Sequence, residues 1–281
     1  MKITRPVLRY FGGKWKLAPW IISNMPEHKV YVEPCGGAAS VLMRKVPAPK
    51  LEVYNEILAE VTNVFKVIRS AELSQQLERL CKLTPFSYEA YLEAWDQNEA
   101  DPVESARKTL VRSFFSYSGL SSDRKPGMRM LHTKYQSGNH RNCARDWSNH
   151  NDHLQIFSDR LKGVMISSKP ALETIAQYDH EDVLIYLDPP YSMHNRTSDI
   201  RYEHDWNDQD HIDMVDVVSR SKSMIMLSGY QCPFYERLEH EGWVMRSSRS
   251  WTSGLNGRDE FLWVNPAAQR SMPQPELELV P

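Results

Sequence analysis

Residues 183–191 read VLIYLDPPY, so a run of five apolar and aromatic side chains leads directly into Asp188, Pro189, Pro190 and Tyr191. A short apolar run that ends at prolines is typical of a strand buried on both faces of a sheet. Ligands of open α/β sheets bind beyond the carboxyl ends of the strands, which is where this tetrapeptide falls. Its two prolines stiffen the turn. The turn can therefore hold an exocyclic amino group, which donates to Asp188 and to a main-chain carbonyl while Tyr191 stacks on the ring.

Short β-rich runs alternate with amphipathic segments on both sides of this stretch, which predicts an α/β fold. We expect strands at residues 30–32, 51–54, 164–167, 183–187 and 224–227, a final hairpin of 244–247 and 261–264, and helices at 38–45, 57–68, 170–178 and 210–221. Residues 72–112 have helical spacing of apolar side chains and indicate an insertion. The expected units are an α/β domain of residues 1–68 and 155–265, an insertion of residues 69–154 and a disordered tail of residues 266–281.

Positive charge is concentrated in residues 107–145, which hold nine Lys and Arg side chains against one acidic residue, Asp123. The local net charge is +8, and because the whole chain has a net charge of −2, the rest carries −10. The stretch also contains aromatic, Ser, Gly and Asn residues, which suits a surface that contacts phosphates and stacks on bases. A solvated basic loop on an ordinary enzyme explains this stretch, taken alone, equally well.

The four cysteines lie 46, 62 and 89 residues apart and form no CxxC pair, so we expect no metal site. No window approaches 18 consecutive apolar residues, and the N-terminus lacks the apolar segment that secretion requires. We therefore expect a cytoplasmic protein that does not bind membranes.

Three further stretches have residue types that suit a ligand site. Residues 33–40 read EPCGGAAS after an expected strand, where small side chains let a ligand approach the backbone. Glu56 follows the next strand, about 20 residues beyond that turn, where a carboxylate of a nucleotide-binding unit accepts hydrogen bonds from ribose hydroxyls. A solvated surface carboxylate is the alternative for Glu56. Residues 10–14 read YFGGK, which is not a phosphate-binding P-loop.

The motifs at residues 10–14, 32–41, 54–57 and 188–191, in that order, resemble the Dam-type (D12 class) DNA adenine-N6 methyltransferases, especially phage-borne members. The resemblance extends from about residue 9 to residue 266. It implies the class I S-adenosylmethionine-dependent methyltransferase fold, a Rossmann-like α/β sheet with a mainly helical target-recognition insertion. It further implies S-adenosyl-L-methionine as methyl donor and double-stranded DNA as partner, and it favours the DNA-binding interpretation of the basic stretch. We expect a monomer.

The resemblance also assigns roles to residues of this chain. It implies catalytic roles for Asp188, Pro189, Pro190 and Tyr191. The cofactor-binding residues that it implies are Tyr10, Lys14, Glu33, Gly37, Glu56 and Asp188. The DNA-binding residues that we expect in the basic stretch are Arg112, Arg124, Lys125, Arg129 and Lys134.

The chain departs from the family pattern at three points. Ala39 stands where the second glycine of a Gly-x-Gly turn is usual, and Glu56 stands where Asp is usual. The insertion does not show the family's GATC-reading pattern clearly. Cytosine-N4 and RNA-adenine methylation share the same amine chemistry and are alternatives, as is an inactive DNA-binding relic. Cytosine-C5 methylation needs a nucleophilic cysteine after the strand that here precedes Asp188, and Cys35 and Cys232 lie elsewhere.

Overall fold

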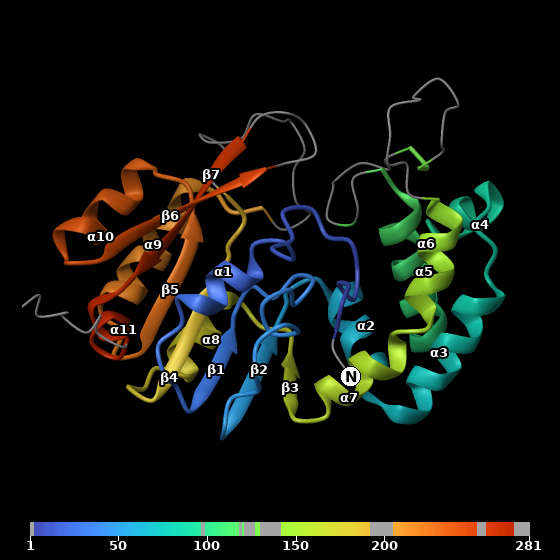
Figure 1. Cartoon of the computed structure of the whole chain (residues 1–281), viewed down its shortest axis with the longest axis horizontal. Helices are drawn as coiled ribbons and strands as arrows, with labels where there is room; N and C mark the ends of the chain where they lie inside the picture. Colours follow the sequence, from blue (N-terminus) through green and yellow to red (C-terminus); the bar gives the residue numbers. More distant parts are fainter. Residues whose placement is uncertain are drawn as a thin grey trace, which may run out of the picture.

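The computed structural model describes residues 3–96, 99–117, 120, 127–129, 142–191, 205–251 and 257–272. These residues form one seven-stranded sheet with the order β3-β2-β1-β4-β5-β7-β6 (Figure 1). The strands are β1 (Val30–Glu33), β2 (Leu51–Asn55), β3 (Val164–Ser167), β4 (Val183–Leu187), β5 (Met224–Gly229), β6 (Val244–Trp251) and β7 (Gly257–Val264). Strands β1 to β5 run parallel, and β7 pairs antiparallel with both β5 and β6. The predicted strands are confirmed, and their ends lie within four residues of the predicted ones.

Strand β4 is apolar throughout because both faces of the sheet are covered. Leu184 and Tyr186 belong to the apolar cluster on one face, and Ile185 and Leu187 belong to the cluster on the other. Successive side chains of a strand point to opposite faces, so a strand between two cores shows no polar alternation. All five residues of β4 are buried.

The helices divide between the two faces and the insertion. Their bounds are α1 (Ala18–Ser23), α2 (Ala59–Arg69), α3 (Ala71–Leu83), α4 (Tyr88–Glu93), α5 (Pro102–Phe115), α6 (Cys143–Asn151), α7 (Leu154–Leu161), α8 (Ala171–Gln177), α9 (Asp208–Ser219), α10 (Glu236–His240) and α11 (Pro266–Arg270), with a 3-10 turn, η2 (Pro233–Tyr235). Helices α8, α9 and α10 contribute to the second cluster, whereas α1, α2 and the insertion helices contribute to the first. The side chain of Asn207 caps α9 in a capping box, as its position before the apolar pattern predicts.

Helices α3 to α7 lie between α2 and β3 in the chain and gather at the end of the molecule opposite β6 and β7 (Figure 1). Helix α2 joins the two parts, because it packs against α3, α5 and α7 as well as against β3. The insertion therefore rests on the sheet through α2 and through polar contacts such as those of Arg160 on α7 with Glu52 on β2 and with the Leu42 carbonyl.

Two expectations about secondary structure are wrong. Residues 38–45 form successive turns rather than a helix, because Ala39 has a φ of 51° and cannot continue a right-handed helix. Residues 266–270 form α11, which packs on β5 and buries Ala268, so this part of the expected disordered tail is ordered. Residues 273–281 lie outside the described part of the chain.

The core of the insertion contains a histidine that cannot easily be charged. His150 on α6 is fully buried, and its ring centroid lies 4.1 Å from that of Phe114 and 5.8 Å from that of Phe157. Neither ring nitrogen has a hydrogen-bond partner among the described residues. Burial, together with the nearby charges of Arg5 and His153, lowers the pKa of His150 to about 3.

We expect His150 to make folding sensitive to acid. The folded chain keeps the ring neutral while the unfolded chain binds a proton below pH 6.5, so this stability is complete above pH 6.5 and is lost as the pH falls toward 3. Between pH 7.5 and 5.5 the free energy of unfolding should fall by about 1.4 kcal/mol more in the wild type than in His150→Phe. Urea denaturation at the two pH values measures this, and an equal fall in both proteins would contradict it.

Candidate active site

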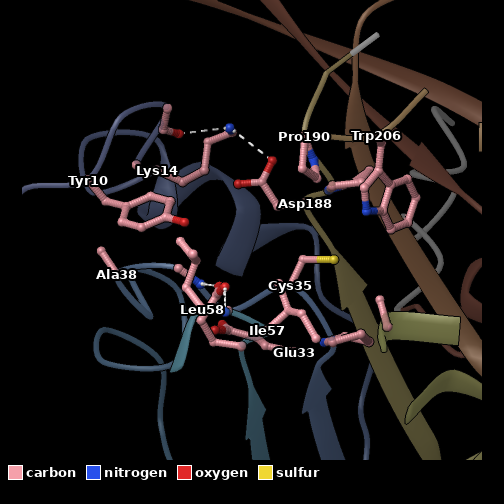
Figure 2. A pocket seen from close by; sticks show the side chains of 18 of the residues that line it. Tyr10, Lys14, Glu33, Cys35, Ala38, Ile57, Leu58, Asp188, Pro190 and Trp206 are labelled. Atoms are coloured by element: carbon pink, nitrogen blue, oxygen red, sulfur yellow. Dashed lines mark hydrogen bonds and ion pairs between the residues drawn. The ribbon is translucent and has the colours of Figure 1, made fainter. Parts of the chain in front are cut away.

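The site lies at the switch point of the sheet. From β1 the chain continues to β2 on one side, whereas β4 lies on the other side, so a crevice opens beyond the carboxyl ends of β1 and β4. This crevice contains a cavity of about 380 Å³. Its walls come from all four sequence motifs, residues 10–14, 33–41, 56–58 and 188–191, together with residues 169–172 and Trp206. Figure 2 shows Lys14 and Asp188 pointing toward each other, with Tyr10 on one side and Pro190 and Trp206 on the other.

Glu33 at the end of β1 lines the cavity with a carboxylate that is almost fully buried. Its Oε1 accepts hydrogen bonds from the Tyr31 hydroxyl and from the Leu42 N–H, both at 2.7 Å. Burial raises the pKa of Glu33 to about 7, although both hydrogen bonds oppose the increase. The two bonds share one oxygen, and they fix the carboxyl plane at the floor of the cavity.

The small residues after β1 are required by close packing. A Cβ at Gly36 would lie 2.2 Å from the Tyr54 ring. Gly37 has a φ of 47°, and a Cβ there would lie 3.1 Å from the Tyr10 ring. Ala39 also has a positive φ, which costs an alanine about 1 kcal/mol or more. The family's usual glycine at this position is explained by this backbone conformation.

Glu56 holds this turn in place from the end of β2. Its Oε2 accepts the Gly37 N–H at 2.8 Å and its Oε1 accepts the Leu58 N–H at 2.9 Å. A carboxylate has about four acceptor positions, so these two bonds do not by themselves prevent a ligand from donating to Glu56. Glu56 is buried at the cavity wall, so the alternative of a solvated surface carboxylate is wrong.

Lys14, which is buried, and Asp188, which is partly exposed, form an ion pair at the cavity wall. The distance from Lys14 Nζ to Asp188 Oδ1 is 2.9 Å, and Nζ also donates to the Gly12 carbonyl at 3.0 Å. Burial alone would lower the pKa of Lys14, but the Asp188 carboxylate outweighs it and the net pKa is raised, so the amine stays charged. Burial raises the pKa of Asp188, and Lys14 opposes that increase. The lysine thus keeps an acceptor available at the end of β4.

Tyr191 lies against the same pair. Lys14 Nζ lies 4.7 Å from the centre of its ring, and the ring of Tyr230 meets it edge-on with the centroids 4.8 Å apart. The structure therefore brings together Tyr10, Lys14, Glu33, Gly37, Glu56, Asp188, Pro189, Pro190 and Tyr191 in one cavity.

The basic stretch is less uniform than its sequence indicates. The side chain of Arg112 is only 4% exposed and pairs with Glu60 at 2.5 Å, so its charge is already balanced and turned away from solvent. Arg107 and Lys108 are likewise buried and paired with acidic residues. Arg129 is half-buried. The pKa of Arg9 is lowered mainly by the burial of Arg9 itself and next by the positive charge of Arg129. Arg124, Lys125 and Lys134 lie outside the described residues.

Sequence reasoning missed residues that support the site from behind. The Tyr54 hydroxyl donates to the Gly37 carbonyl at 2.6 Å. The Asn55 amide nitrogen donates to the carbonyls of Pro34 and Lys169, and so ties the turns after β1 and β3 together. Tyr54 and Asn55 are the two residues before Glu56 in the motif at residues 54–57. Their place in that motif is the sequence signal that could have indicated a role at the site.

A mostly parallel sheet of this order, with a ligand cavity at the carboxyl ends of β1 and β4, defines the class I methyltransferase fold. The family model of the D12 class N6 adenine-specific DNA methyltransferases matches residues 10–250, and the chain belongs to this family. It transfers a methyl group to the N6 amino group of adenine at specific sites in DNA. The chain is also 25% identical over 270 residues to the Type II methyltransferase M.MjaIII of Methanocaldococcus jannaschii, a match that covers 86% of this chain and 90% of the relative.

No cluster of three or more His, Cys, Asp or Glu side chains in the described part of the chain has the arrangement of a metal site. None of the helices in that part combines the length and the apolar character needed to span a bilayer.

Proposed function

We propose that the chain uses S-adenosyl-L-methionine to methylate adenine in double-stranded DNA, with the reaction in the cavity between β1 and β4. The observation that carries the proposal is the Lys14–Asp188 pair, which holds a charged acceptor beside the Pro189 carbonyl in that cavity. We propose further that residues 69–154 form the target-recognition insertion of a monomer that works in the cytoplasm, where its DNA substrate lies.

The cavity fits the proposed cofactor. Its volume of about 380 Å³ lies within the usual range for small-molecule sites. Glu56 would accept hydrogen bonds from ribose hydroxyls, and Glu33 would meet the methionine amino group, which favours its ionised form. The turn at Gly37 allows close approach to the backbone, with Tyr10 beside it. When bound, S-adenosylmethionine supplies an electrophilic methyl group on a sulfonium sulfur.

The residues after β4 would activate the target amine. The lone pair of the adenine amino nitrogen is conjugated with its ring, which makes it a poor nucleophile. Asp188 and the Pro189 carbonyl would each accept one N–H, turn the hydrogens out of the ring plane and aim the lone pair at the methyl carbon. Asp188 and the Pro189 carbonyl would hold the amine in line with the C–S bond of the methyl donor, whose electron pair would remain on sulfur. The extra proton on nitrogen then leaves to solvent, and no strong base is needed.

The target adenine has to leave the duplex to reach this cavity. Tyr191 would stack on the flipped base, since it is the aromatic residue of the tetrapeptide at the cavity wall. The phosphate contacts would come from the basic residues of the insertion that are not neutralised by acidic partners. We propose Arg129, Arg124, Lys125 and Lys134 for this role and exclude Arg112.

We expect Glu56→Gln to weaken cofactor binding without unfolding the chain. The variant loses the charge that the ribose hydroxyls would meet, so the dissociation constant of S-adenosylmethionine should rise about 10-fold or more. Calorimetric titration measures this, with Glu173→Gln as a control, because Glu173 is an exposed residue of the first turn of α8. Equal affinities for the wild type and Glu56→Gln would refute the assignment.

DNA affinity should depend steeply on salt. Neutralising Arg124 and Lys125 together should reduce the slope of log K against log salt concentration by up to about 2, because each phosphate contact contributes about 0.9. Neutralising Lys29 and Lys162 together is the matched control. Both residues directly precede or lie just before parallel strands, so they lie at the amino ends of the strands, away from the cavity at the carboxyl ends. An unchanged slope in the Arg124 and Lys125 variant would place the DNA contact elsewhere.

A further inference from the structure

Strand β7 brings an acidic residue to the catalytic edge of the sheet. Because β7 runs antiparallel to β5, its early residues lie beyond the carboxyl ends of the parallel strands. Phe261 pairs with Gly229, the last residue of β5, so Glu260 lies one step past the end of β5, beside Tyr230. A residue at this place can reach the turn that follows β4.

Glu260 contacts that turn through the tyrosine hydroxyl. The distance from Tyr191 Oη to Glu260 Oε2 is 3.3 Å, and the hydroxyl donates to the carboxylate. The ring of Tyr191 is also held at its edge by Tyr230 and over its face by Lys14. Residues from three separate segments therefore hold the Tyr191 ring: Glu260 at the hydroxyl, Tyr230 at the edge and Lys14 over the face.

Glu260 itself does not line the cavity, whereas Tyr191 and Lys14 do. Glu260 can therefore affect the reaction only through residues that do line the cavity. Burial lowers the pKa of Lys14, and the Glu260 carboxylate helps to raise it, after the larger contributions of Asp188 and Tyr186. The direct contact of Glu260 with the turn after β4 is the hydrogen bond from the Tyr191 hydroxyl.

We propose that Glu260 is a positioning residue that holds the Tyr191 ring in the orientation needed to stack on the flipped adenine. This inference rests on the proposed role of residues 188–191. A tyrosine ring that is already fixed loses less freedom when the base enters, so more of the bound adenines reach the reactive geometry. Without Glu260, the base binds in the same place but is less often aligned.

The test compares single-turnover methylation of plasmid DNA by the wild type, Glu260→Ala, Tyr191→Phe and the double variant. Each single change should lower the rate about 10-fold, which is the lower range for a hydrogen bond to a charged group. The double variant should lose no more than Tyr191→Phe does, because both changes remove the same bond, while Tyr191→Phe also removes the hydroxyl that interacts with Asp188. Affinities for duplex DNA and for S-adenosylmethionine should stay within about 2-fold of the wild type, since phosphate and cofactor contacts supply them.

Two variants calibrate the result. Asp259→Ala removes the neighbouring, exposed acidic residue of β7 and should keep the wild-type rate. Glu260→Gln keeps an oxygen that can accept from Tyr191 and should recover part of the rate; it also replaces Glu260→Ala if that variant does not fold. A rate for Glu260→Ala equal to that of Asp259→Ala would overturn the inference, as would a loss of about 100-fold in the double variant, which would show independent effects.

The same assay on Asp188→Ala separates the two proposals. If Asp188→Ala is inactive and Glu260→Ala is as active as the wild type, the inference fails and the proposed function stands. If Asp188→Ala retains activity, the proposed role of residues 188–191 fails, and the inference fails with it.

Discussion

Asp188→Ala should lose at least about 100-fold in the rate of methyl transfer while keeping nearly the full affinity for duplex DNA. The carboxylate is assigned to the reacting amine, and removing one aligned acceptor or donor from a closed site costs about 2.7 to 4 kcal/mol of transition-state stabilisation. Most DNA affinity should come from phosphate contacts of the insertion. Incorporation of labelled methyl groups and a filter-binding titration measure the two quantities separately.

This experiment needs a control for folding, because the change leaves Lys14 buried without its partner carboxylate. Asp188→Asn keeps the size of the side chain and one acceptor oxygen, and it should be impaired less than Asp188→Ala but clearly below the wild type. Thermal denaturation establishes that both variants are folded. A folded Asp188→Ala that methylates DNA at more than about a tenth of the wild-type rate would show that residues 188–191 are not the catalytic turn.

Gly36→Ala should abolish cofactor binding and destabilise the chain. The added Cβ would lie 2.2 Å and 2.5 Å from two carbons of the Tyr54 ring and 3.0 Å from the Asn55 carbonyl oxygen. The ring cannot move away easily, because Tyr54 is fully buried against Phe65 and its hydroxyl is bonded to the Gly37 carbonyl. Overpacking of this kind costs about 1 to 3 kcal/mol.

The matched control is Gly163→Ala, since a Cβ at Gly163 would meet no atom within 4 Å. Urea denaturation and calorimetric titration with S-adenosylmethionine should show wild-type behaviour for Gly163→Ala and a loss of both stability and affinity for Gly36→Ala. Wild-type cofactor affinity in Gly36→Ala would mean that the turn after β1 tolerates displacement and does not shape the site.

The features that sequence reasoning predicted correctly are those that short stretches determine. Strand β4 and its turn depend on nine consecutive residues, 183–191. Glu56 could be placed because the spacing between a first strand and the next follows from the geometry of a βαβ unit.

The predictions that failed did so because of contacts or backbone conformations that the local sequence pattern does not reveal. Residues 38–45 have a helical apolar pattern, but Glu33 accepts the Leu42 N–H and Ala39 adopts a positive φ, so the backbone turns instead. Arg112 was counted in a stretch with a local charge of +8, whereas its partner Glu60 lies on α2, outside that stretch. The sequence pattern predicted no role for Glu260, because only the antiparallel pairing of β7 brings it to Tyr191.

The central claim is tested most directly by identifying the modified base. Plasmid DNA from cells that lack adenine methylation of their own, and that express either the wild type or Asp188→Ala, is digested to nucleosides and analysed by mass spectrometry. The account predicts N6-methyladenine in DNA from the wild type and none above background in DNA from Asp188→Ala. N4-methylcytosine, or no methylated base at all in DNA from cells that express the folded wild type, would contradict it.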